Sequence, residues 1–441
     1  MYKKLIPFLF ILFFQITNAQ NEFITIWKPG SVQKIKFPGR GANFNVNWEE
    51  IGYTQHNGFQ NNVTSTTEFS IDFGTALNPV PSNATYRVKI TNGNGAFTQI
   101  RFFDNTLTPI YNNTEYSKLL DVSQWGNIQW QSFEDAFSLC MNMDVTAIDA
   151  PNLTSVTSLR QMFYICPALV GNPSFSTWDT SSVSTMYNMF ADANNFNQPI
   201  GNWNVSNVTD MYGVFDGAAS FNQPLKNWNT SNVIKMDHMF HAASSFNQDI
   251  KNWDTSKVID MEEMFHTASS FNQNIGTWNL SALTNAKDMF LDSGLNCQNY
   301  DNALYGWSMN PATNNNINLG NASPMVYSHM GAVNARNNLT NIKGWLISGD
   351  TYNNQCESSL STSEVLNKNE INIYPNPAND FIHVKNVKGS NSYKIFDASG
   401  RIFLEDHLKE EKINVSSLIE GNYMLQIISK DKIQSLKFIK K

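Results

Sequence analysis

The chain has 441 residues, of which only 15% are charged, and its formal net charge is −7 at pH 7. This length exceeds that of one ordinary core, so we expect several modules. The acidic balance argues against a nucleic-acid partner, which requires a strongly basic face.

Residues 1–19 have the pattern of a secretory signal peptide. Two lysines precede an apolar run over residues 5–14, and small residues predict cleavage between Ala19 and Gln20. The apolar run is too short to span a bilayer. Because residue 20 is Gln and not Cys, lipid attachment at the new N-terminus is not expected. These features predict an exported protein without membrane insertion.

Residues 20–117 predict a module of β-strands. Four segments alternate apolar and polar residues, and clusters of Gly, Pro and Asn separate them. The segments cover residues 23–27, 44–48, 69–73 and 86–90. We therefore expect a small antiparallel β-sandwich at this end of the chain.

A 25-residue repeat occupies the middle of the chain. Tryptophan recurs at this spacing, and phenylalanine recurs in a second series. The two series are Trp178, Trp203, Trp228, Trp253 and Trp278, and Phe190, Phe215, Phe240, Phe265 and Phe290. A fixed period of this length is typical of a solenoid, in which each unit buries its apolar face against its neighbours.

Each repeat predicts one short helix and one short strand. The apolar residues of a clean unit are spaced by three, four and three residues, as on one face of a helix: Val208, Met211, Phe215 and Ala218. The segment 221–228 is expected to be extended and to stack on its copies. These patterns predict an α/β solenoid over residues 118–296, with degenerate first units.

The remaining C-terminal residues divide into three parts. Residues 297–356 contain two helical patterns and are expected to cap the open end of the solenoid. Residues 357–370 are polar and lack periodicity, which is typical of a linker. Residues 371–441 are again rich in predicted strands, and we expect a second β-sandwich there.

Four cysteines in an exported chain suggest disulfides, with three pairings open. Cys297 and Cys356 bracket the expected cap, so we favour a bond between them. Cys140 and Cys166 lie at related positions in adjacent units. For this second pair, two buried free thiols are as reasonable as a bond.

Motifs of metalloproteases, serine hydrolases and phosphate-binding loops are not found, so neither catalysis nor a cofactor is expected. His241 and His266 occupy equivalent positions in adjacent units, where they could form a metal pair. The equivalent residues elsewhere are Ala191, Asp216 and Leu291. This variety favours a tolerant exposed position over a metal site.

Other residue series in the repeat have both a structural and a ligand-binding interpretation. The tryptophans could stack on sugars, but their strict register favours burial in the core. The series Asn197, Asn222, Asn247 and Asn272 is expected to satisfy backbone groups at each turn.

Acidic residues could bind calcium, although a solvated face is the preferred interpretation. They are Asp210, Asp260, Glu262 and Glu263. A partner would contact positions that vary between units. Examples are Thr209-Asp210, Ile234-Lys235 and Ile259-Asp260.

The repeat resembles that of the BspA-like leucine-rich-repeat surface proteins over roughly residues 118–350. The unit from Trp253 carries the resemblance, as Trp253-Asp254-Thr255-Ser256-Lys257-Val258 followed by Met261 and Met264-Phe265. The resemblance implies a curved α/β solenoid at the cell surface, an adhesive or binding role, and no catalytic residues.

The C-terminal residues resemble the sorting domain read by the type IX secretion system. The motifs are Ile373-Tyr374-Pro375-Asn376-Pro377-Ala378, Tyr393-Lys394-Ile395-Phe396-Asp397 and Gly421-Asn422-Tyr423-Met424-Leu425. The resemblance implies contact with that machinery and passage through the outer membrane of a Gram-negative bacterium. The mature protein would then be released or held at the cell surface.

These observations predict a non-catalytic secreted or cell-surface protein that binds an extracellular protein or polysaccharide. The alternative is a structural spacer or scaffold of the bacterial surface or biofilm matrix, which the near-identical units favour. A hydrolytic enzyme is the third hypothesis, and it requires a pocket of convergent carboxylates that the sequence does not reveal.

Overall fold

The computed structural model describes residues 21–103, 114–356, 358, 372–385, 392–397, 401–408, 411–428 and 433–441. The chain divides into two compact units, residues 1–360 and 361–441. The expected signal cleavage site at Ala19 and Gln20 lies outside the described residues, as does nearly all of the expected linker. None of the helices within the described ranges is both long and apolar enough to cross a membrane.

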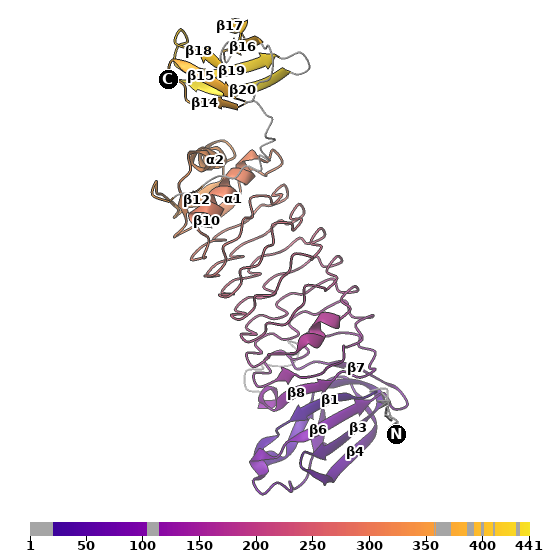
Figure 1. The fold of residues 1–441 in the computed structure, drawn as a ribbon. Coiled ribbons are helices and arrows are strands. Elements are labelled where there is room, and N and C mark those ends of the chain that lie inside the picture. Colours follow the sequence, from indigo (N-terminus) through magenta and orange to yellow (C-terminus); the bar gives the residue numbers. More distant parts are fainter. Residues whose placement is uncertain are drawn as a thin grey trace, which may run out of the picture. The chain divides into compact units, whose positions relative to one another are not determined.

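The N-terminal part of the first unit is a seven-stranded sheet (Figure 1). Its order is β4-β3-β6-β1-β8-β9, with β7 also paired to β3. The strands are β1 (Phe23–Trp27), β3 (Gly39–Glu50), β4 (Tyr53–Ser65), β6 (Tyr86–Thr91), β7 (Ala96–Ile100), β8 (Leu119–Gln124) and β9 (Asp144–Val145). A separate pair joins β2 (Lys34–Phe37) to β5 (Phe69–Asp72), and 3-10 turns cover Gly30–Val32, Pro81–Asn83 and Thr114–Ser117.

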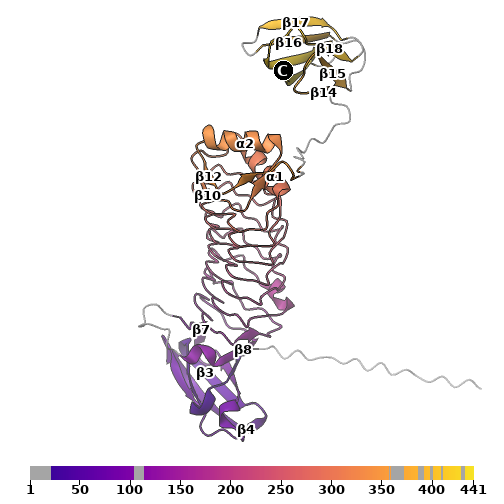
Figure 2. The ribbon, with the colours of Figure 1, turned by 90° about the vertical axis from the view of Figure 1, so that its left-hand side faces the viewer.

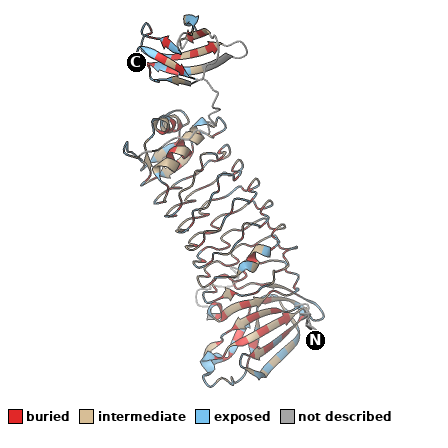
Figure 3. Cartoon of the chain, in the orientation of Figure 1, coloured by how far each residue is buried: buried red, intermediate tan, exposed pale blue. Residues whose placement is uncertain are grey.

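Alternation of side chains explains why these segments form strands. In β1, Phe23, Thr25 and Trp27 are buried, whereas the residues between them are partly exposed. Buried and more exposed positions alternate along the strands of this sheet (Figure 3). Such a period of two places one face of the sheet against a core. That core continues beyond the sheet, because the Phe23 ring meets the Trp130 ring edge-on at 4.9 Å between centroids.

The repeats form stacked coils, and the expected fold class is contradicted. An α/β solenoid flanked by two β-sandwich modules was expected, but the described residues form mostly small separate sheets with two α-helices, both after residue 296. The repeat units contain consecutive turns in place of the predicted helix and strand, with one 3-10 turn at Pro173–Thr177.

Left-handed backbone explains why the predicted helix does not form. In the part of each unit where a helix was predicted, two residues have a positive φ. His238 and Ala242 have φ of 57° and 54°, and Glu263 and Thr267 have similar values, 52° and 56°, in the next unit. A right-handed helix cannot contain such residues. Apolar spacing of three and four residues therefore arises here from successive turns.

Backbone bonds between units replace those of a helix. The amides of Met211, Gly213 and Phe215 each donate to a carbonyl of the next coil, at 3.0 Å in all three cases. Isolated parallel bridges repeat the same step, as in the series Asp210, Lys235 and Asp260. Each coil therefore lies directly on its neighbour (Figure 2), and the 25-residue period follows from this one-to-one pairing.

Aromatic side chains fill the inside of the coils. Each tryptophan of the series is at most 3% exposed, so its interpretation as core is confirmed. Trp228 and Trp253 stack at 6.3 Å, and Phe215 and Phe240 at 5.5 Å. Except in Trp178, each indole also donates to a carbonyl of the preceding unit, as Trp228 Nε1 does to Ile200 at 3.1 Å.

The last coil is covered by α1 (Cys297–Met309) and α2 (Met330–Asn341). Short parallel pairs accompany them: β10 (Asn318–Asn321) with β12 (Leu346–Ser348), and β11 (Val326–Tyr327) with β13 (Thr351–Tyr352). Trp307 of α1 continues the tryptophan series, because its Nε1 donates to Ile275 at 3.1 Å.

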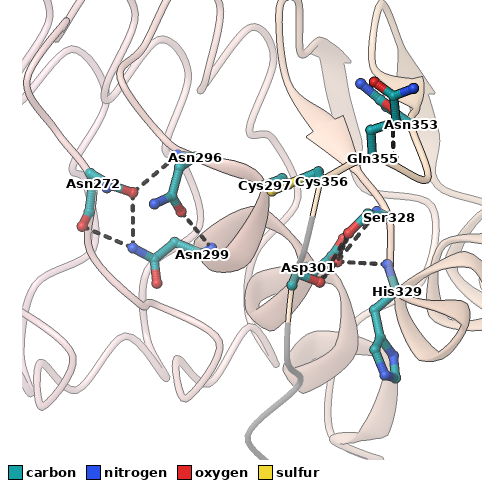
Figure 4. The surroundings of a disulfide bond; sticks show 11 residues. Asn272, Asn296, Cys297, Asn299, Asp301, Ser328, His329, Asn353, Gln355 and Cys356 are labelled. Atoms are coloured by element: carbon teal, nitrogen blue, oxygen red, sulfur yellow. Dashed lines mark hydrogen bonds between the residues drawn. A yellow bond between two sulfur atoms is a disulfide. The ribbon is translucent and has the colours of Figure 1, made fainter.

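A disulfide joins Cys297, the first residue of α1, to Cys356 (Figure 4). Beside it, Asn296 caps α1 by accepting from the amide of Asn299 at 2.9 Å. Asp301 accepts from the amide of His329 at 2.8 Å. Cys140 and Cys166 are buried free thiols.

The second unit contains two small antiparallel sheets around its own core, formed largely by Ile382, Ile395 and Leu425. One sheet comprises β14 (Asn372–Tyr374), β15 (Phe381–Lys385) and β18 (Lys412–Asn414). The other comprises β17 (Ile402–His407), β16 (Ser392–Phe396), β19 (Gly421–Ile428) and β20 (Ile433–Lys440). A separate core allows this unit to be considered independently of the first.

Candidate binding surface on the stacked coils

Three positions of the repeat, which we call the outer columns, lie at the surface and change from unit to unit. They follow each tryptophan by 9, 10 and 13 residues. The columns read Tyr187, Tyr212, Asp237, Glu262 and Lys287; Asn188, Gly213, His238, Glu263 and Asp288; and Ala191, Asp216, His241, His266 and Leu291. Ala191 and Gly213 are buried and most of the other members are half-buried, whereas the tryptophans are all fully buried.

The turns place neighbouring members of a column side by side. Every residue of the second column has a left-handed φ, between 51° and 57°. The adjoining amides bond to the next coil, as Asn188 N does to the carbonyl of Tyr212 at 2.8 Å. Side chains one repeat apart are therefore neighbours on the surface.

One part of this surface is an aromatic row. The rings of Tyr187 and Tyr212 stack at 4.6 Å, and His238 follows at 5.2 Å from Tyr212. The Arg160 guanidinium lies 4.4 Å above the Tyr187 ring. Burial raises the pKa of Tyr212 to about 12, so its hydroxyl is neutral near pH 7. Tyrosine and arginine are the residue types that dominate binding energy at many protein interfaces.

A histidine cluster shares His238 with this row. The cluster comprises Asp216, His238, His241, Glu263 and His266. Three imidazoles surround one carboxylate oxygen, Glu263 Oε2. It lies 3.1 Å from His266 Nδ1, 3.5 Å from His238 Nε2 and 4.0 Å from His241 Nε2. The second nitrogen of His241, Nδ1, lies 2.6 Å from Asp216 Oδ1.

These contacts shift the ionisation of the cluster. The hydrogen bond to Asp216 raises the pKa of His241, and the half-burial of the ring opposes this shift. Burial is the largest influence on Glu263 and acts to raise its pKa, but the hydrogen bond from His266 and the charges of the three imidazoles together lower it. These contacts therefore favour the ionised form of the Glu263 carboxylate.

The structure brings the expected histidine pair together. The rings of His241 and His266 lie 5.0 Å apart. The repeat spacing alone did not predict that His238 and Glu263 lie beside this pair, because those two residues belong to a different column. The signal that could have shown the connection was the spacing of three residues between His238 and His241, repeated by Glu263 and His266.

The four acidic candidates do not gather into one site. Asp210 and Asp260 lie two units apart, and each carboxylate accepts the amide two residues later at 3.0 Å. Glu262 accepts from the side chain of Asn285 at 3.0 Å. Only Glu263 joins the histidine cluster.

The asparagine series has the expected structural role. Asn222 Oδ1 accepts the amide of Asn247 at 2.9 Å and the side chain of Gln248 at 2.9 Å. The same bonds recur one unit earlier and one unit later.

Two of the variable positions expected to contact a partner are Ile234 and Ile259. They are 39% and 41% exposed.

Two protein families match parts of the chain. Residues 131–243 and 224–329 match a family described as "Mycoplasma protein of unknown function, DUF285". Residues 372–441 match the secretion system C-terminal sorting domain. No curated protein matches the chain. Neither match is the BspA-like leucine-rich repeat that was expected. Together the two matches support a surface protein with a repeat region and a C-terminal sorting domain.

The sorting domain gives the route and destination of the protein. A chain that carries it interacts with the type IX secretion machinery and is exported to the cell surface or the extracellular space. The stacked coils and their outer columns therefore function outside the cell.

Proposed function

We propose that the protein binds an extracellular protein or glycan through the outer columns of its stacked coils, without catalysis. The observation that carries this proposal is the contrast between constant buried positions and variable outer ones. The tryptophan series never changes, whereas the adjacent columns contain tyrosine, histidine, acidic and basic residues. Variation that is confined to the surface is typical of repeat proteins that recognise extended partners.

The aromatic row is the strongest candidate for direct contact. Arg160, Tyr187 and Tyr212 are partly exposed and already ordered by stacking. Pre-ordered side chains lose little conformational freedom on binding, which reduces its entropic cost. Rings and guanidinium groups suit both protein side chains and the apolar faces of sugars.

The experiment is a binding screen with residues 21–360, a unit with its own continuous core. Matrix-protein and glycan arrays would be probed with the wild type and with a row variant, Arg160→Ser, Tyr187→Ser and Tyr212→Ser. A control variant would carry Lys226→Ser and Lys251→Ser, because both lysines are exposed and lie outside the outer columns. We expect saturable binding that only the row variant loses.

Two other results would redirect the assignment. Binding that survives in the row variant would move the site, for example to the hollow of 210 Å³ over β3 and β4, which is lined by Trp48 and the exposed Phe59. Absence of binding on both arrays would favour the scaffold function. The uniform asparagine series, which adds the same bonds at every coil, is the observation that supports a scaffold.

A further inference from the structure

We propose that His241, Glu263 and His266 bind one divalent transition-metal ion, of which zinc is the natural candidate. The ion would join two adjacent coils, since His241 belongs to one unit and the other two residues to the next. This inference goes beyond the binding function proposed above and does not depend on it.

The distances between the donor atoms fit a small ion. One donor atom from each of the three residues lies within 4.8 Å of the others. Zinc binds nitrogen and oxygen at about 2.0–2.2 Å, so tetrahedral ligand atoms lie about 3.3 Å apart. The separation of 3.1 Å from His266 Nδ1 to Glu263 Oε2 already matches this value, and the 4.0 Å from His241 Nε2 requires a small side-chain adjustment.

Asp216 prepares His241 for this role. Its Oδ1 lies 2.6 Å from His241 Nδ1, so Nδ1 carries the proton and Nε2 presents its lone pair towards Glu263. A carboxylate that orients a histidine ligand in this way is the usual outer partner of a metal-bound imidazole.

His238 contacts the carboxylate of the same site. Its Nδ1 is buried and, among the described residues, has no hydrogen-bond partner. Its Nε2 lies 3.5 Å from Glu263 Oε2, which is consistent with a proton on Nε2 that faces the carboxylate. We assign His238 as a positioning residue for Glu263, because hydrogen bonds from neighbouring groups also orient carboxylate ligands.

The donor set selects the kind of ion. Two imidazoles and one carboxylate suit zinc, copper or nickel, whereas calcium and magnesium require oxygen ligands. Three protein ligands leave a fourth position for water or for a group on a partner. On binding, the ion replaces the hydrogen on His266 Nδ1: an imidazolium releases it to the solvent, whereas in a neutral imidazole the proton moves to Nε2.

The simpler interpretation is a set of ordinary surface ion pairs, and metal titration distinguishes the two. The chain from residue 21 to residue 441, without a polyhistidine tag and freed of metal, would be titrated with zinc chloride by calorimetry. We expect one equivalent to bind and the apparent melting temperature to rise with zinc concentration. Calcium and magnesium chlorides should produce neither effect.

Single substitutions test the assignment of ligands. His241→Asn, Glu263→Gln and His266→Asn should each abolish binding of the one equivalent. Asp216→Asn should weaken it by about 10-fold to 100-fold, as expected for an outer partner. His407→Asn changes an exposed histidine of the second unit and should leave the titration unchanged. Metal-free melting curves would show that each variant is folded.

Three results would overturn the proposal. The first is a wild-type chain that binds no zinc saturably. The second is a titration that persists unchanged in the three ligand variants, which would place the metal elsewhere. The third is equal binding of calcium, which would contradict the donor set.

Discussion

The inside and the outer columns of the stacked coils follow opposite rules. Inside, Trp203, Trp228 and Trp253 are each 3% exposed, and each of these three indoles bonds to the preceding unit. Outside, Gly213, His238 and Glu263 occupy one column although they share neither size nor charge. In these coils a constant aromatic residue marks a packing requirement, whereas a variable outer residue marks a position available for function.

The two regions also differ in how they respond to a lost side chain. A buried ring contacts copies of itself on both sides, so its loss affects three units at once. An outer residue contacts its column neighbours and solvent. Stability should therefore depend on the inside, and recognition on the outside.

The largest expected effect is that of Trp228→Ala. The substitution leaves a cavity beside the Trp253 indole, on which Trp228 stacks, and removes the indole hydrogen bond to the Ile200 carbonyl. We expect a loss of about 3–5 kcal/mol in the free energy of unfolding. Urea denaturation followed by circular dichroism measures this value. A loss below about 1 kcal/mol would show that the tryptophan series does not hold the coils together.

A smaller effect is expected for Asn222→Ala. The side chain accepts two hydrogen bonds from the next unit, at a position with access to solvent. Water can replace these bonds in part, so we expect a loss of about 1 kcal/mol. The exposed Lys226→Ala in the same unit is the matched control and should change stability by less than about 0.5 kcal/mol. Equal effects of the two substitutions would contradict the structural role of the asparagine series.

Asp237→Asn should stabilise the protein, and only at higher pH. Burial, followed by the charge of Asp260, raises the pKa of Asp237 to about 6. Below the ordinary pKa of about 4 the carboxyl is protonated in both the folded and unfolded states, so it costs nothing. Above about pH 6 the folded state contains an unfavourable charge, which asparagine removes.

Because Asp237 is partly exposed, solvent screening limits this gain to about 1 kcal/mol at pH 8. Melting temperatures of the wild type and of Asp237→Asn, measured from pH 4 to pH 8, provide the test. A difference that does not grow with pH would contradict the assigned pKa.

The smallest effect is expected for Ile259→Ser. Ile259 is 41% exposed and one of the variable surface positions, so its side chain contributes little packing. We expect a change within about 0.5 kcal/mol. A larger loss in thermal denaturation would mean that this surface is structural, and would weaken the division between inside and outside.

The sequence alone predicted the period, the buried tryptophans and the asparagine series correctly. These features depend on residues that pair with their own copies, and a repeat shows such pairing directly. The predicted secondary structure of the repeat was wrong because apolar residues spaced by three and four also fit successive turns. The deciding feature is the left-handed backbone at residues such as His238 and Glu263, which side-chain spacing does not reveal.

The candidate surface was predictable only in part. The repeat spacing predicts that His241 and His266 are neighbours, since both belong to one column. The contact of His238 and Glu263 with this pair depends on the distance between two columns around the coil. The turns of the backbone set that distance. Trp307 was also unrecognised as part of the tryptophan series, because α1 interrupts the 25-residue spacing.

The most direct test of the account measures stability and binding on the same protein. A variant with Tyr187→Ser, Tyr212→Ser and His238→Ser would be compared with the wild type for thermal unfolding and for binding to a partner found on the arrays. We predict a melting temperature within about 4 °C of the wild type and loss of binding. A variant that unfolds, or one that retains full binding, would contradict the assignment of recognition to the outer columns.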